Sequence, residues 1–133
     1  MVRIVWLPEP ELEALDAARS YLELHVHPTI AMAMTDEMLR VPTVTKLASD
    51  ILRASDLPLI DADDARVKRA TWEIEDHHKM SPVLLVRGMP LIIADGYHLL
   101  CAIHRLDPLA EVECRLISEI TEREAANGTY ARH

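Results

Sequence analysis

The chain has 133 residues, half of them hydrophobic, which is enough for one domain with a buried core and excludes extensive disorder. Its formal net charge is −8, and residues 1–56 and 57–133 each carry four more acidic than basic side chains. Because binding to duplex nucleic acid depends on clustered Lys and Arg, this even acidic balance argues against DNA as a ligand.

Residues 1–56 are predicted to form an N-terminal helical extension. It starts with residues 2–7, which form either a short strand or an apolar lead-in. A first helix begins after Pro10, where acidic residues suit the first turn and Leu and Ala recur at helical spacing. Pro28 suits the first turn of a second helix, and the leucine and isoleucine spacing predicts a third over 44–54.

Residues 57–133 have the pattern of an α/β core with a small mixed sheet and flanking helices. Two apolar runs flank the sequence Arg-Gly-Met-Pro, which indicates a hairpin, and an alternating run follows Pro108. The predicted elements are a strand at 57–60, a helix at 64–78, hairpin strands at 83–86 and 91–94, a helix from 97 to about 106, a strand at 111–117 and a helix at about 118–126. Together with residues 1–56, this core is expected to make one compact domain.

The two cysteines, Cys101 and Cys114, lie in apolar segments and form no Cys-x-x-Cys motif. We therefore expect inert, buried, reduced thiols rather than a cysteine active site. The chain begins with neither a basic start nor a continuous apolar run, and no stretch reaches the roughly 20 apolar residues of a membrane span. These features predict a cytoplasmic protein that does not bind membranes.

The candidate functional residues are most closely spaced where the second hairpin strand meets the next helix, at "ADGYHLL" (94–100). Asp95 is expected to cap the helix, and Gly96 permits a tight reversal with close backbone approach. Free amides at a helix start attract anions, and His98 and Arg105 could add positive charge. Asp95 opposes an anion, because it offers its own negative charge to the same amides.

The stretch "SPVLLVRGMPLIIADGYHLLCAIHRL" followed by "AEVECRLI" resembles the core of the ParB/sulfiredoxin superfamily. Gly96, His98 and Ala102 occupy positions that match the superfamily's glycine, polar pair and alanine-rich helix. Upstream, "LPLIDADDARV" is similar to the stretch where ParB-like proteins start their first strand, and Arg66 would correspond to a nucleotide-contacting arginine. The resemblance spans residues 57–117.

The resemblance implies a nucleotide ligand, since ParB-like proteins bind and hydrolyse CTP and sulfiredoxins use ATP. It also implies Mg²⁺ as the companion ion. Two departures leave the catalytic residues unassigned: Leu99 replaces a phosphate-holding arginine, and Tyr97 stands where sulfiredoxins carry their catalytic cysteine. The predicted ligand-binding residues are Asp95, Gly96, Tyr97, His98, Arg66 and Arg105.

Two metal hypotheses follow from the acidic and histidine residues. Asp61 and Asp63 are weak candidates for Mg²⁺, because the acidic run 61–64 is better explained as the end of a strand and the cap of the helix at 64–78. On a helix, His98 and His104 would diverge by about 120°, so they cannot easily close on one ion with Cys101. No other metal site is predicted.

The alternative to nucleotide binding is a role in protein–protein interaction. The chain could be a degenerate superfamily member that acts as a protein-interaction module without nucleotide chemistry. Leu99, the acidic balance and the helical extension favour this hypothesis. Its partner would be a second copy or another protein, bound through the N-terminal helices.

Overall fold

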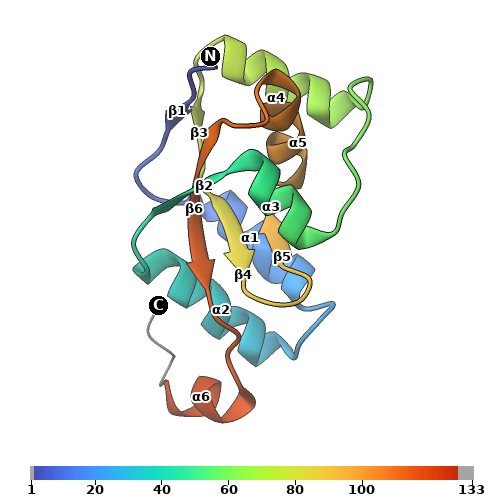
Figure 1. Ribbon diagram of the computed structural model, residues 1–133. Helices are drawn as coiled ribbons and strands as arrows, with labels where there is room; N and C mark the ends of the chain where they lie inside the picture. Colours follow the sequence, from blue (N-terminus) through green and yellow to red (C-terminus); the bar gives the residue numbers. More distant parts are fainter. Residues whose placement is uncertain (1, 129–133) are drawn as a thin grey trace.

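Figure 1 shows the computed structural model, which describes residues 2–128. Met1 and residues 129–133, the end of the expected core, lie outside the described residues. The elements in chain order are β1 (Val5–Trp6), α1 (Leu12–Leu22), α2 (Pro28–Arg40), β2 (Val44–Leu47), α3 (Ala48–Ser55), α4 (Ala65–Glu75), β3 (Lys79–Met80), β4 (Val83–Val86), β5 (Ile92–Asp95), α5 (Tyr97–Leu106), β6 (Glu111–Ile117) and α6 (Glu122–Asn127). The predicted α/β class with a mixed sheet is confirmed.

The main sheet has four strands in the order β2-β6-β4-β5. β4 and β5 pair antiparallel, as the hairpin prediction required, and β6 runs parallel to β4, placing Leu85 opposite both Ile93 and Leu116. β2 pairs antiparallel with β6, with Val44 opposite Cys114. The short strands β1 and β3 form a separate parallel pair.

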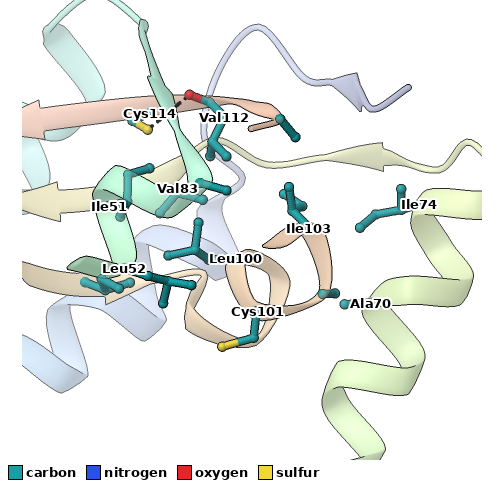
Figure 2. Close-up of a cluster of buried hydrophobic side chains, with 14 of the residues drawn as sticks. Ile51, Leu52, Ala70, Ile74, Val83, Leu100, Cys101, Ile103, Val112 and Cys114 are labelled. Carbon is teal, nitrogen blue, oxygen red and sulfur yellow. Dashed lines mark hydrogen bonds between the residues drawn. The ribbon is translucent and has the colours of Figure 1, made fainter. Parts of the chain in front are cut away.

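The central strand β4 is buried on both faces, because helices cover each side of the sheet. Val83 and Leu85 pack into a core cluster with α3, α4 and α5, whereas Leu84 and Val86 pack with α1 and α2. Figure 2 shows the first cluster, in which Val83 lies beside Ile51 and Leu100, and α5 lies between Val83 and the α4 side chains Ala70 and Ile74. A continuous apolar run is the expected sequence of a strand covered on both faces.

Two predicted elements are wrong. The helix predicted over 44–54 is strand β2 followed by the shorter α3, because Val44–Leu47 pairs with β6 along its full length. Residues 57–60, predicted as a strand, belong to no strand in the described part of the chain. Pro58 has no N–H to donate to a neighbouring strand, and β2 already pairs with the free edge of β6.

The N-terminal segment and the expected core share one sheet. β2, from residues 1–56, forms an edge strand of it, and α1 packs beside β5 at the opposite edge. The last helix starts at Glu122 rather than 118, where Thr121 and Glu124 form a reciprocal capping box. Within residues 2–128, no helix has the length and apolarity to cross a membrane.

Arg115, in the middle of β6, is only 4% exposed and joins three parts of the fold. Its side chain points toward the helix α2, whose C-terminal carbonyls it binds, and toward the segment before α1. The guanidinium donates to the carbonyls of Met38 (3.2 Å), Leu39 (3.0 Å), Val41 (2.8 Å) and Pro8 (2.9 Å), to Thr43 Oγ1 (3.0 Å) and to Glu9 Oε2 (3.2 Å). A buried cation is thus fully partnered.

Candidate functional site

The corner between β5 and α5 is built on a glycine that no other residue could replace without strain. Gly96 is the N-cap of α5 with φ of 103°. A Cβ at this position would lie 3.0 Å from Val83 Cγ2, so both the backbone conformation and the packing require glycine. The strand therefore turns into the helix directly against β4.

Asp95 does not cap α5, which corrects the sequence prediction. The N-cap is Gly96, and no side chain provides a capping hydrogen bond to this helix. Asp95 is still part of β5, where it lies opposite Leu84, and the strand geometry fixes its direction. Its carboxyl group forms no capping hydrogen bond with the amides of α5.

The first turn of α5 leaves its amides open. The first intrahelical hydrogen bond runs from Leu100 N–H to the Gly96 carbonyl at 2.8 Å. The amides of Tyr97, His98 and Leu99 precede it and therefore have no partner within the helix. These N–H groups and the helix dipole give the corner a partial positive charge, which favours an anion.

Two cavities, each of about 390 Å³, meet at this corner, and Asp95, Gly96, Tyr97 and His98 line both. We call the first of them the acidic cavity. It is also lined by Leu99 of α5 and by residues in or next to α1, α4 and β3: Glu11, Glu13, Ala14, Glu73, Lys79, Met80 and Ser81. The apolar cavity is completed by Tyr21, Leu57, Ile93 and Ala94. The structure thus brings four of the six predicted ligand-binding residues together.

The acidic cavity carries more negative than positive side chains. Its lining holds the carboxyl groups of Glu11, Glu13, Glu73 and Asp95 together with Lys79 and His98. Glu73 also lies 3.8 Å from both Arg69 Nε and His78 Nδ1, which do not line the cavity. Burial, with a smaller contribution from the nearby charge of Glu11, raises the pKa of Asp95 to about 6. Glu11, Glu13, Glu73 and Lys79 come from the start of α1, from α4 and from β3, so the local sequence around the corner gave no signal for them.

The two predicted arginines lie elsewhere. Arg105, near the far end of α5, donates to the Ile60 carbonyl from Nε (3.0 Å) and Nη2 (2.5 Å), and it lines a different cavity beside Trp72. Arg66 is exposed in the first turn of α4. The pKa of Asp64 is lowered, chiefly by the Val67 amide and also by the charges of His98 and Arg66, which indicates that α4 starts near His98.

Tyr97 and Arg105 together hold the irregular segment 57–60 against α5. The Tyr97 hydroxyl donates to the Pro58 carbonyl, and Arg105 binds the Ile60 carbonyl two residues later. Desolvation raises the pKa of Tyr97. The segment that sequence analysis expected in the sheet instead forms part of the wall of the apolar cavity, through Leu57.

The acidic run 61–64 forms a turn and a cap. Asp61 Oδ1 accepts the Asp63 N–H at 3.2 Å, and Asp64 Oδ1 accepts the Arg66 and Val67 amides, which confirms the capping interpretation. Asp63 lies 4.0 Å from Lys68 Nζ. Among residues 2–128, no three His, Cys, Asp or Glu side chains are arranged to hold a metal ion. Mg²⁺ at Asp61 and Asp63 stays a prediction.

Leu99 and the two thiols belong to the core side of α5 and β6. Leu99 is partly buried, packs against the first core cluster and also lines the acidic cavity. Cys101 and Cys114 are free and fully buried, as predicted. Desolvation raises the pKa of both thiols, that of Cys114 to about 12, so neither is a ready nucleophile.

Comparisons of the chain with protein-family models, with curated proteins and with solved structures match none of them. The resemblance to the ParB/sulfiredoxin superfamily therefore stays a prediction from the residues quoted above.

Proposed function

We propose that this chain binds a small phosphate-bearing ligand, a nucleotide such as CTP or ATP, at the corner formed by Asp95, Gly96, Tyr97 and His98. The observation that carries the proposal is the position of the open α5 amides between two cavities. Each cavity has about 390 Å³, within the range of about 300–1,000 Å³ that small-molecule sites occupy.

The two cavities suit two parts of one ligand. The amides of Tyr97, His98 and Leu99 would bind phosphate oxygens, with His98 as an additional contact. The apolar cavity, with Tyr21, Leu57 and Ile93, would receive the base, since aromatic and aliphatic side chains pack against a planar ring. Mg²⁺ would arrive with the nucleotide rather than on a ligand set of the chain.

The affinity is expected to be low for two electrostatic reasons. Leu99 supplies no bidentate, charge-assisted hydrogen bond of the kind that an arginine gives phosphate. The excess of carboxylates in the acidic cavity also opposes an anion. Each loss of about 1.4 kcal/mol weakens binding about tenfold, so we expect a dissociation constant nearer millimolar than micromolar.

Calorimetry with CTP, ATP and GTP in the presence of Mg²⁺ tests the proposal, with Leu99→Arg as the gain-of-binding variant. Leu99 borders the acidic cavity, so an arginine there can extend its charged end into it and keep the fold. We expect at least tenfold tighter nucleotide binding. Leu109→Arg, at a leucine 68% exposed away from the corner, is the matched control and should change nothing. Absence of heat with millimolar nucleotide in both wild type and Leu99→Arg contradicts the proposal.

The second candidate is a protein-interaction module that binds no nucleotide. Its support is the presence of four exposed apolar side chains in the N-terminal region, Leu12, Leu24, Met32 and Leu39, together with the acidic cavity. Sedimentation measurements that show a stable dimer, with a melting temperature that nucleotides do not change, would favour this candidate.

A further inference from the structure

We propose that the groove between α4 and the end of α5 binds an acidic segment of a partner protein, which places an apolar side chain beside Trp72 and its carboxylates on Lys68 and Arg69. We call this surface the α4–α5 groove, and its lining comes from the turn before α4, from α4 and from the last residues of α5. It shares no lining residue with the two cavities at the β5–α5 corner, so binding in the groove does not depend on the proposed function.

The α4–α5 groove combines a buried base with exposed apolar walls. It has a volume of about 260 Å³, and Val67, Thr71 and Trp72 of α4 line it together with Leu106 of α5. Val67 is buried, whereas Trp72 is 55% and Leu106 37% exposed. Small-molecule sites occupy about 300–1,000 Å³, so a space of this size better suits one anchoring side chain of a protein partner.

Trp72 is a preformed anchor for such a partner. Its ring contacts the ring of His78 edge-on, with the centroids 4.9 Å apart, and His78 Nε2 lies 2.9 Å from Asp76 Oδ2. These contacts hold the exposed indole in place before a partner arrives, which lowers the entropy lost on binding. Tryptophan is also enriched among the residues that dominate the binding energy of protein–protein interfaces.

Positive charge borders the groove on a chain whose net charge is −8. The side chains of Lys68 and Arg69 are 64% and 79% exposed, and Arg105 lines the groove from α5. Lys68 Nζ lies 4.0 Å from Asp63 Oδ1, and Arg69 Nε lies 3.8 Å from Glu73 Oε1. Exposed ion pairs of this kind contribute little to stability, so the carboxylates of a partner can replace them. The net charge of the chain repels an acidic segment from most other surfaces.

The charges of α4 run against the dipole of the helix. Arg66 and Lys68 lie in its first turn and Glu73 and Glu75 in its last, whereas acidic residues at the start and basic residues at the end stabilise a helix. Within residues 2–128, every other helix has at least one terminal charge of the favoured sign. A local departure from the stabilising arrangement is typical of a functional surface. Because Glu75 also lines the groove, the acidic end of the partner lies over the first half of α4.

The experiment measures the binding of fluorescently labelled polymers to the full chain by anisotropy. A random copolymer of glutamate and tyrosine supplies both carboxylates and apolar side chains, whereas polyglutamate supplies the carboxylates alone. Oligothymidylate represents single-stranded nucleic acid, which also combines negative charge with stacking on aromatic rings.

Charge reversal locates the binding on α4. The double variant Lys68→Glu, Arg69→Glu changes the two exposed cations beside the groove. Its matched control is Arg19→Glu, Arg53→Glu, which makes the same charge change on α1 and α3. We expect wild type to bind the glutamate–tyrosine copolymer saturably, the α4 double variant to bind it at least about tenfold more weakly, and the control to change its affinity less than about twofold.

Trp72→Ala tests the anchor, with circular dichroism to confirm the fold, and Leu24→Ala, at a leucine 81% exposed outside the groove, is its control. Trp72→Ala should weaken binding of the copolymer at least about tenfold and leave the weaker binding of polyglutamate unchanged. Absence of saturable copolymer binding, or equal weakening by the two charge-reversed double variants, would overturn the proposal. Tighter binding of oligothymidylate than of the copolymer, with the same dependence on Trp72, would instead assign the groove to single-stranded nucleic acid and overturn the acidic partner.

Discussion

Replacing Arg115 by methionine tests whether this one buried side chain holds the helices of the N-terminal region to the sheet. The substitution keeps an unbranched side chain of similar length and removes all five N–H donors. Six acceptors then lose their partner, among them the carbonyls at the end of α2 and the Glu9 carboxylate.

The magnitude follows from the burial of these groups. Arg115 is 4% exposed, and a buried acceptor left without a partner costs about 1–3 kcal/mol. The losses are not additive, because some carbonyls can bind water once the side chain is gone. Because several carbonyls lose their partner at once while Glu9 stays largely exposed, we expect Arg115→Met to lose about 3–5 kcal/mol in total. The free energy of unfolding of a native protein is typically about 5–15 kcal/mol, so the variant should be marginally stable.

Urea denaturation followed by far-ultraviolet circular dichroism measures this loss, and the fluorescence of Trp6 and Trp72 provides a second probe. Arg19→Met is the control, since Arg19 forms only an exposed ion pair with Asp16 and should lose less than about 1 kcal/mol. Arg115→Lys keeps the charge but only three N–H donors, so its loss of unfolding free energy should lie between those of Arg19→Met and Arg115→Met. A loss below about 1 kcal/mol for Arg115→Met would refute the assigned role.

Three further predictions concern the corner and the core. Gly96→Ala should lower stability by about 1–3 kcal/mol in thermal melting, because alanine must adopt φ of 103° and press on Val83, whereas Gly128→Ala, with nothing within 4 Å, should lose less. Asp95→Asn should be more stable than wild type by up to about 3 kcal/mol at pH 7.5, because the folded-state pKa of Asp95, about 6, lies above the ordinary 3.8. As the pH falls from 6 to 4, the stability of wild type should rise to that of the variant. Equal denaturation midpoints of the two proteins at pH 7.5 would contradict the raised pKa of Asp95. Cys101 and Cys114 should resist thiol reagents at pH 8 in the folded protein and react fully in denaturant, and rapid labelling of the folded protein would show that they are accessible.

The elements that sequence analysis predicted well have their cause in nearby residues. The hairpin β4–β5 follows from two apolar runs on either side of a turn, and β6 follows from strict alternation. β2 was missed because Leu47, Ile51 and Leu52 recur at helical spacing, and only the distant partner β6 draws Val44–Leu47 into a strand. Segment 57–60 was misassigned for the converse reason, since its apolar residues found no free strand edge.

Arg115 shows a second limit of sequence reasoning. Alternation in β6 places Glu111, Glu113 and Arg115 on one face, which suggested a solvated side of the strand. That face is solvated only at its beginning, because α2 covers it from about Arg115 onward and turns the arginine into a buried partner of its carbonyls. Burial along a single strand therefore changes with what packs on it, which the strand itself does not encode.

At the corner between β5 and α5, residues distant in the sequence likewise determine the net charge of the cavity. Gly96 and the open amides are local features, and they predict attraction of an anion. The carboxylates of Glu11, Glu13 and Glu73 arrive from α4 and from the start of α1, and they weaken that attraction. A permanent phosphate site would gain from cations in these positions, as an arginine at Leu99 would provide. Because burial raises the pKa of Asp95 to about 6, acidification below that value neutralises one of the four carboxyl groups of the acidic cavity and should lessen their opposition to an anion.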